Sequence, residues 1–295
     1  MSSPNPFAFR GVYAATTTPF TDAGELDLDG FEQHCSWLAD EGVAGIVPNG
    51  SLGEYEALTE DERAATVKAA IQAVGARIPV IPGVSGKTGV EARRWAEQAG
   101  AAGCPAVMCL PPTSHLPSHD ETMAHFREVA RAGLPIIAYN NPYSTRVDLT
   151  PSMLARLSEI DEVQAVKEFS QDARRVAAIR QAAPAMQILC GCDDTFVESM
   201  LMGAVGWIAG FVNALPRKSV ELYEACAAER WRDAVEGYLA MLPLLRYDAD
   251  SRVFVQAIKL AQSEAGRYGG PVRLPRLPLD DDTASVVRAA TRALL

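Results

Sequence analysis

The sequence predicts an α/β fold, a TIM (β/α)8 barrel followed by a C-terminal helical extension. Short apolar runs recur eight times between Gly11 and Phe211, and helical patterns lie between them. Eight alternations of strand and helix are typical of a closed parallel barrel. A doubly wound open sheet is the alternative, but no glycine-rich dinucleotide loop accompanies the alternation.

The eight apolar runs are predicted to be buried parallel strands. Many are rich in β-branched residues, and they are continuously apolar, whereas strands with one solvated face alternate. The runs are GVYAATTT from Gly11, GIVPNG from Gly45, IPVIPGV from Ile78, AVMCLPP from Ala106, LPIIAYNNP from Leu134, VQAVKEF from Val163, MQILCGCDD from Met186 and VGWIAGF from Val205.

Local signals mark where two of the helices begin. Thr59 is followed three residues later by Glu62, which is a capping box. Pro151 comes directly after Thr150, and proline suits the first position of a helix.

The pattern changes near residue 216, where the alternation with strands stops. The segments 219–247 and 251–266 have helical patterns instead. We therefore expect residues 1–216 to form the barrel, with a short N-terminal lead-in, and residues 217–295 to form a helical region packed on it.

Composition and charge exclude several classes of protein. Hydrophobic residues make up 48% of the chain and charged residues 22%, so a packed core is expected. The net charge of -10 disfavours nucleic-acid binding, which needs basic patches. No apolar run reaches the roughly 20 residues that span a bilayer, and the N-terminus lacks the apolar stretch of a signal peptide. We expect a soluble cytoplasmic protein, with no nucleic-acid or membrane partner and with its six cysteines reduced.

Lys167 is the candidate nucleophile. It lies at the carboxyl end of the strand predicted from Val163, and such strand ends open into the active-site mouth of a barrel. Partial desolvation favours the free amine, which can condense with a keto group to give an imine. The alternative is a lysine whose charge reaches water from the end of a strand.

Tyr139 and the NGSLG turn are the other candidate site elements. Tyr139 ends the adjacent predicted strand, so its hydroxyl could relay protons in the same cavity. The alternative is a core tyrosine with a backbone partner. In the turn, backbone N–H groups near Gly50 and the hydroxyl of Ser51 suit a substrate carboxylate. The alternative is an ordinary turn between a strand and a helix.

We expect neither a metal nor a cofactor. His115 and His119 lie four residues apart, but Pro117 separates them and no further ligand cluster is evident. Cys190 and Cys192 lack the second pair of a zinc site. No phosphate-binding or dinucleotide-binding fingerprint occurs.

Three strand-end motifs taken together, NGSLGE, YNNP and VKE, resemble the dihydrodipicolinate synthase and N-acetylneuraminate lyase family. The likeness runs from Gly11 to about Ala265. It implies a TIM barrel with C-terminal helices, usually assembled as a homotetramer that is a dimer of dimers. It also implies metal-independent class I Schiff-base chemistry on pyruvate or another small 2-keto acid.

The resemblance implies a role for each matching residue. Lys167 corresponds to the Schiff-base lysine and Tyr139 to the proton-relay tyrosine. Gly50 and Ser51 correspond to the carboxylate-binding segment, and Ile208 to a residue whose backbone faces the bound keto acid.

The sequence departs from the synthase at three positions. Leu52 replaces the second hydroxyl of the proton relay in the synthase pattern Gly-Thr-Thr-Gly-Glu. Thr113 stands near the place of a tyrosine that the synthase contributes across its dimer. Ser144 holds the position of the arginine that binds aspartate semialdehyde, and Arg146 follows two residues later. These changes argue against a true dihydrodipicolinate synthase.

The motifs NGSLGEY, YNNPY and KEFS look more like the branch that contains Δ1-pyrroline-4-hydroxy-2-carboxylate deaminase, a hydro-lyase and deaminase of hydroxyproline catabolism. A compact pocket lined by Leu52, Tyr143 and Phe169 would suit its small cyclic imino acid. A pyruvate-dependent aldolase or a sugar-acid dehydratase is the alternative enzyme. A catalytically inactive keto-acid sensor or scaffold is the alternative without turnover.

Overall fold

The computed structural model describes residues 7–295, which separate into two compact units. The first unit contains Ile81–Trp207 together with the N-terminal stretch up to Arg10. The second contains Gly11–Val80 and Ile208–Leu295. Helix α9 (Pro216–Ala227) begins where the boundary at residues 216 and 217 was expected, and that boundary stays a prediction.

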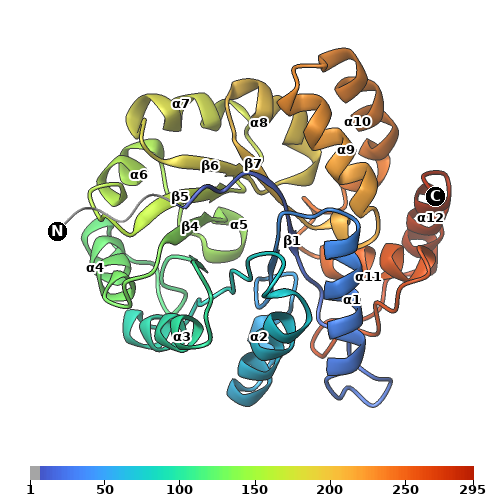
Figure 1. Ribbon diagram of the computed structural model, residues 1–295, viewed down its shortest axis with the longest axis horizontal. Coiled ribbons are helices and arrows are strands. Elements are labelled where there is room, and N and C mark those ends of the chain that lie inside the picture. The colour runs from blue at the N-terminus through green and yellow to red at the C-terminus, as the bar shows by residue number, and fades with distance from the viewer. Residues whose placement is uncertain (1–6) are drawn as a thin grey trace. The chain divides into compact units, whose positions relative to one another are not determined.

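The first unit alternates parallel strands with helices (Figure 1). Strands β3 to β7 pair in chain order, each parallel to the next. All of β4 is buried, and β5 is buried except at Gln164, so helices and neighbouring strands cover both faces. The strands are β3 (Val107–Cys109), β4 (Ile136–Asn140), β5 (Val163–Glu168), β6 (Gln187–Cys190) and the first two residues of β7 (Gly206–Ala209). The helices are α3 (Gly89–Ala101), α4 (His119–Ala130), α5 (Pro142–Thr145), α6 (Pro151–Leu157), α7 (Arg174–Ala182), α8 (Phe196–Met202) and the short η2 (Asp193–Thr195).

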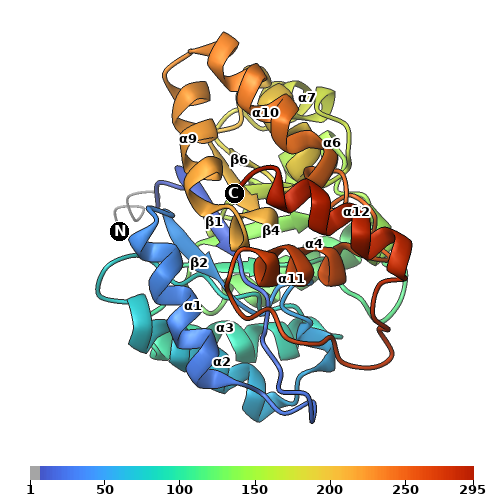
Figure 2. The same ribbon diagram turned by 90° about the vertical axis from the view of Figure 1, so that its right-hand side faces the viewer.

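The second unit contains one parallel strand pair and the C-terminal helices. Strand β1 (Gly11–Ala15) pairs with β2 (Gly45–Val47). Helix α1 packs along α2, and α11 packs along α12 (Figure 2). The helices are α1 (Leu28–Asp40), α2 (Glu60–Val74), α9, α10 (Trp231–Leu245), α11 (Phe254–Glu264), α12 (Asp281–Arg292) and the short η1 (Tyr55–Ala57) and η3 (Phe211–Asn213).

The third predicted strand, over 78–84, is incomplete. Its backbone forms two isolated parallel bridges, Val80 with Ile46 and Gly83 with Met108, while the other seven runs contain regular strands in the described part of the chain. Two prolines within the run, Pro79 and Pro82, interrupt the strand, because proline has no backbone N–H to donate to a hydrogen-bond ladder. The proline carbonyls still accept hydrogen bonds, from Ile46 and Met108 respectively.

The predicted helix starts at residues 59 and 150 are confirmed. Thr59 Oγ1 accepts the backbone N–H of Glu62, and Glu62 Oε2 accepts the backbone N–H of Thr59. Thr150 caps α6, whose first residue is Pro151. Each cap satisfies backbone N–H groups that have no partner inside the helix.

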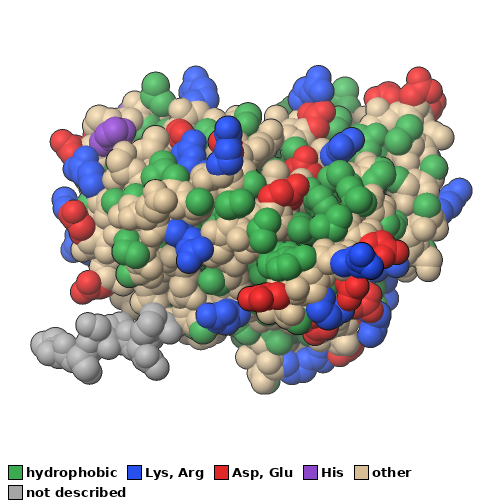
Figure 3. Space-filling view, turned by 90° about the horizontal axis from the view of Figure 1, so that it is seen from above, with side chains coloured by type: hydrophobic (Ala, Val, Ile, Leu, Met, Phe, Trp, Pro, Cys, Tyr) green, Lys and Arg blue, Asp and Glu red, His purple; other side chains and the backbone are tan. Residues whose placement is uncertain are grey.

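Helix α10 has apolar side chains on two faces. Tyr238 and Met241 are buried, whereas Val235 and Leu239 are exposed. Figure 3 looks onto the face that carries α10 and shows hydrophobic side chains gathered there. Within residues 7–295, neither α10 nor any other helix combines the length and the hydrophobicity required to cross a bilayer.

One buried histidine in each unit is held in its neutral form. Burial lowers the pKa of His34 to about 4, and its Nε2 lies 2.9 Å from Asn213 Oδ1. Burial likewise lowers the pKa of His125 to about 4, and its Nε2 lies 3.1 Å from the carbonyl of Leu110. In both cases the desolvated imidazolium would be costly.

Stability should therefore fall as the pH drops from 7 to 5. The unfolded chain binds protons at these histidines near pH 6.5, whereas the folded chain does so only near pH 4, so the free energy of unfolding rises with pH between the two values. The free energy of unfolding then changes by at most about 1.4 kcal/mol per pH unit for each histidine. Urea unfolding at pH 5, 6 and 7 measures it. His125→Gln should flatten the slope, and His115→Gln, at a half-exposed side chain, is the control. A wild-type slope in the His125→Gln variant contradicts this account.

Candidate active site at the ends of strands β4 and β5

Lys167 and Tyr139, predicted separately from the sequence, lie side by side. They are register partners on β5 and β4, so their side chains emerge on the same face of the sheet. Lys167 Nζ lies 4.4 Å from the centroid of the Tyr139 ring. The two residues are 6% and 4% exposed. The side chains of the candidate nucleophile and the candidate proton relay therefore lie next to each other, and both are almost completely shielded from solvent.

A register shift between β4 and β5 creates this pairing. Ile136 pairs with Val163, but the next residue, Ile137, pairs with Ala165, so Gln164 is an extra residue on β5. The side chain of Gln164 accepts the backbone N–H of Phe7, which anchors the irregularity. Because successive side chains on a strand alternate between faces, the extra residue decides that Lys167 points to the same side as Tyr139.

The amine of Lys167 lies among aromatic rings. Its Nζ is 6.0 Å from the centroid of Phe169, and the Phe169 ring meets the Tyr139 ring edge to face at 6.5 Å. In the described residues Nζ forms no ion pair and no hydrogen bond. An amine with aromatic neighbours and no carboxylate partner is available to react with a carbonyl group.

Gly191 defines the path of the Lys167 side chain. A Cβ atom at this position would lie 2.9 Å from both Cγ and Cε of Lys167, and 2.8 Å from the carbonyl of Glu168. The Gly191 N–H donates to that carbonyl at 2.8 Å. The pair Cys190 and Cys192 indicated only a weak metal motif here, and the role of Gly191 was not predicted. The available signal was a lone glycine inside the run predicted as a strand from Met186, because such a glycine often marks close backbone approach.

Asn141 fixes the hydroxyl of Tyr139. Its Nδ2 donates to the tyrosine oxygen at 2.9 Å, and its Oδ1 accepts the N–H of Ser144 as the cap of α5. Because the tyrosine oxygen accepts from Asn141, its own proton can be donated to a ligand. Sequence reasoning missed Asn141, although it belongs to the YNNP motif.

Asn140 and Glu168 connect the ends of β4 and β5 by hydrogen bonds on the face of the sheet opposite to Lys167. Asn140 Nδ2 donates to both carboxylate oxygens of Glu168, at 3.2 and 3.0 Å, and its Oδ1 accepts the N–H of Leu149. The Ser170 N–H donates to Glu168 Oε1 at 2.6 Å. Burial raises the pKa of Glu168, and these hydrogen bonds oppose that shift. The network holds the backbone from which Lys167 projects.

The remaining predicted residues have different environments. In the first unit, Tyr143 is 52% exposed and donates its hydroxyl to the carbonyl of Ser170. In the second unit, Leu52 and Ile208 are buried, and Ser51 is partly exposed in the turn after β2. The binding roles expected for Tyr143, Leu52, Ser51, Gly50 and Ile208 stay predictions. Among residues 7–295, no group of three His, Cys, Asp or Glu side chains is arranged to hold a metal ion.

Comparisons with known proteins show the family to which the chain belongs. The chain matches the dihydrodipicolinate synthetase family over residues 8–294. It is 32% identical over 287 residues to the 4-hydroxy-tetrahydrodipicolinate synthase of Methanothrix thermoacetophila, which covers 95% of each chain. It is similar to the structure of dihydrodipicolinate synthase from Thermotoga maritima, with a TM-score of 0.90, 27% identity and coverage of 98% of this chain and 100% of that one. It is also similar to a prophage protein of the dihydrodipicolinic acid synthase family from E. coli K12 in complex with pyruvate, with a TM-score of 0.91, 28% identity and coverage of 98% and 99%.

These matches confirm the predicted fold, an α/β barrel of parallel strands with C-terminal helices. The dihydrodipicolinate synthetase family consists of class I lyases and aldolases. The chain belongs to the dihydrodipicolinate synthetase family and is an enzyme of that class.

The contact between Gly191 and Lys167 leads to a prediction. Gly191→Ala should slow reductive trapping of pyruvate at Lys167 by about 10²-fold, the scale of loss when a reacting group is displaced by an ångström. The matched control is Gly237→Ala, because a Cβ there meets nothing within 4 Å. Trapping rates from intact-mass spectrometry measure both variants. Equal rates in Gly191→Ala and wild type would show that Lys167 does not depend on this glycine.

Proposed function

We propose that the chain is a Schiff-base-forming lyase acting on a small 2-keto acid or cyclic imino acid, with Lys167 as nucleophile and Tyr139 as proton relay. The observation that supports it is the 4.4 Å contact between Lys167 Nζ and the Tyr139 ring at the ends of paired strands. Family membership supports the same chemistry. The pyruvate bound to the similar E. coli K12 protein makes pyruvate the first keto acid to test.

The proposed steps begin with the free amine of Lys167. It attacks the keto carbon to form a C–N bond, and the carbonyl oxygen takes a proton from the Tyr139 hydroxyl to give a carbinolamine. The nitrogen returns one proton to the Tyr139 oxygen, the hydroxyl takes that proton and leaves as water, and a protonated imine results. The imine withdraws electrons from the adjacent carbon, so a bond at that carbon can break. Asn141 keeps the tyrosine oxygen in place throughout.

The carboxylate of the substrate is proposed to bind the turn at Gly50 and Ser51. This assignment is carried over from the resemblance of NGSLGE to the family motif. The same resemblance supports a backbone contact to the substrate from Ile208. Leu52 and Tyr143 are proposed to line the part of the pocket that selects the remainder of the substrate.

Δ1-Pyrroline-4-hydroxy-2-carboxylate is our proposed substrate. Lys167 would add to the ring C=N bond, the 4-hydroxyl would leave as water, and the ring would open and hydrolyse to 2,5-dioxopentanoate and ammonia, with net uptake of one water. Leu52 and Ser144 support this choice over aspartate semialdehyde, because they replace a relay hydroxyl and a carboxylate-binding arginine of the synthase pattern. We further propose that the protein is cytoplasmic and, as the resemblance implies, that it is a homotetramer.

The first test is covalent trapping. With pyruvate and borohydride, hydride reduces the imine to a stable secondary amine, so the mass of Lys167 should increase. Lys167→Ala should abolish the modification, and Lys218→Ala, at a lysine with an exposed side chain on α9, should not. Peptide mass spectrometry locates the adduct. If no keto acid or imino acid tested forms an adduct, the proposed chemistry is contradicted. An adduct without turnover would indicate a keto-acid sensor.

The second test concerns the hydroxyl of Tyr139. Tyr139→Phe keeps the ring beside Lys167 but removes the proton relay, so turnover should fall by about 10²–10⁴-fold. Trapping at Lys167 should slow as well, because carbinolamine formation and dehydration need proton transfer. The fold should persist, since the lost hydroxyl leaves no large cavity. Steady-state rates and thermal melts measure both effects. Near-normal turnover in Tyr139→Phe would assign the tyrosine a packing role.

A further inference from the structure

The turn that carries Gly50 and Ser51 ends at a fully buried carboxylate. Glu54 follows Ser51 by three residues and has a left-handed backbone, with φ of 53°. Its side chain is 0% exposed, and Oε1 accepts a hydrogen bond from Lys259 Nζ at 2.8 Å. The Lys259 side chain is 2% exposed. Two charges removed from water in this way depend on each other, because either one alone would be buried without compensation.

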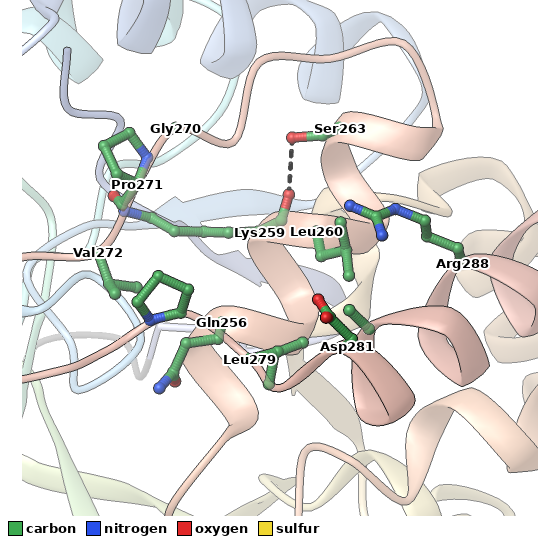
Figure 4. A pocket seen from close by; sticks show the side chains of 12 residues that line it. Gln256, Lys259, Leu260, Ser263, Gly270, Pro271, Val272, Leu279, Asp281 and Arg288 are labelled. Atoms are coloured by element: carbon green, nitrogen blue, oxygen red, sulfur yellow. Dashed lines mark hydrogen bonds between the residues drawn. The ribbon is translucent and has the colours of Figure 1, made fainter. Parts of the chain in front are cut away.

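Both partners of this ion pair also bind the chain beyond α11. Glu54 Oε2 accepts the N–H of Arg273 at 3.1 Å, and Lys259 Nζ donates to the carbonyl of Pro271 at 2.6 Å. Figure 4 shows Lys259 reaching from α11 toward the stretch at Gly270 and Pro271. The ion pair therefore joins three segments: the turn after β2, helix α11 and the stretch 270–273.

Arg273 extends the same connection to the start of α2. Its guanidinium binds both carboxylate oxygens of Glu62, at 2.7 and 2.6 Å, and donates to the carbonyl of Ala57 at 3.0 Å. The hydrogen bonds from Arg273 lower the pKa of Glu62. The C-terminal stretch thus holds the chain on the far side of the turn, from Glu54 to Glu62.

The near side of the turn is held by Asn49. This residue also has a left-handed backbone, with φ of 58°. Its Nδ2 donates to the carbonyl of Arg63, and its Oδ1 accepts the hydroxyl of Thr66. Gly50 and Ser51 therefore lie between two buried anchors, of which Asn49 is tied locally and Glu54 is tied to residues more than 200 positions away.

We infer that the Glu54–Lys259 ion pair is a positioning device for the carboxylate-binding turn. This inference rests on the proposed function, in which Gly50 and Ser51 bind the substrate carboxylate. Glu54 and Lys259 are both enclosed, so they act through the backbone of the turn rather than by touching the substrate. The helical extension thereby has a part in substrate binding, because α11 and the stretch 270–273 determine where the turn lies.

The test is the dependence of Lys167 trapping on pyruvate concentration. Glu54→Gln keeps the side-chain volume but removes the charge and places amide hydrogens against donor groups. The half-saturating pyruvate concentration should rise at least about tenfold, because the turn moves, while the trapping rate at saturation should change less than about threefold. Lys259→Met should act in the same direction.

Two further variants separate positioning from general stability. Glu54→Gln combined with Lys259→Met removes both buried charges, so it should fold even if the single variants do not, and its half-saturating concentration should stay raised. Arg288→Gln removes the ion pair of Arg288 with Glu264, which links α12 to α11 without a hydrogen bond to Glu54 or Lys259 in the described residues. It should lower the melting temperature without changing the half-saturating concentration.

The outcomes distinguish this inference from the function on which it rests. If neither pyruvate nor any other keto acid or imino acid tested modifies the wild-type protein, the proposed function is contradicted. A wild-type protein that is trapped, together with an unchanged half-saturating concentration in the double variant, overturns the positioning role alone. The positioning role is also overturned if Arg288→Gln raises the half-saturating concentration as much as Glu54→Gln at an equal loss of melting temperature.

Discussion

The pairing of Tyr139 with Lys167 across β4 and β5 is the constraint on which the candidate site depends. It exists because Gln164 adds one residue to β5, which sets the face on which Lys167 emerges. Several contacts keep this register: the Phe7 backbone binds Gln164, the Asn140 amide binds Glu168, and the Gly191 backbone binds the Glu168 carbonyl. A slip of one residue would turn the lysine toward the helices and remove it from the tyrosine.

The ionisable side chains buried on the two faces of this strand pair differ in their hydrogen bonding. Glu168 is satisfied by the side chain of Asn140 and the backbone of Ser170, so its desolvation is offset by hydrogen bonds. Lys167 lacks such partners among the described residues and contacts aromatic rings instead. An unpaired amine beside a hydrogen-bonded carboxylate is the arrangement expected where a protein gives up local stability for reactivity.

The sequence was sufficient to predict the barrel, the two capping signals and the positions of Lys167 and Tyr139 at the ends of neighbouring strands, because each follows from a local pattern or from the order of strands. It was insufficient where a feature depends on distant segments. The strand over 78–84 is interrupted, and to predict this from the sequence one has to consider the hydrogen bonds that Pro79 and Pro82 cannot donate. The extra residue Gln164, the close approach of Gly191 to Lys167 and the ion pair of Glu54 with Lys259 join segments whose contact no local periodicity encodes.

Substrate choice within this family depends on residues that take no part in forming the imine. In the proposed mechanism Lys167 and Tyr139 serve any 2-keto acid equally, since every such substrate offers the same carbonyl group. Discrimination has to come from groups that meet the rest of the substrate, and a site built to hydrogen-bond a polar group rejects analogues far better than an apolar one does. In the proposed pocket Leu52 is apolar and buried where the synthase pattern has a hydroxyl, and Ser144 is neutral where that pattern has an arginine. A second carboxylate would therefore lose its charged partner, while a compact ring would gain apolar contact. For this reason identity of about 32% to named synthases shows the family and the enzyme class of the chain, and the side chains beyond Lys167 direct the substrate proposal toward a cyclic imino acid.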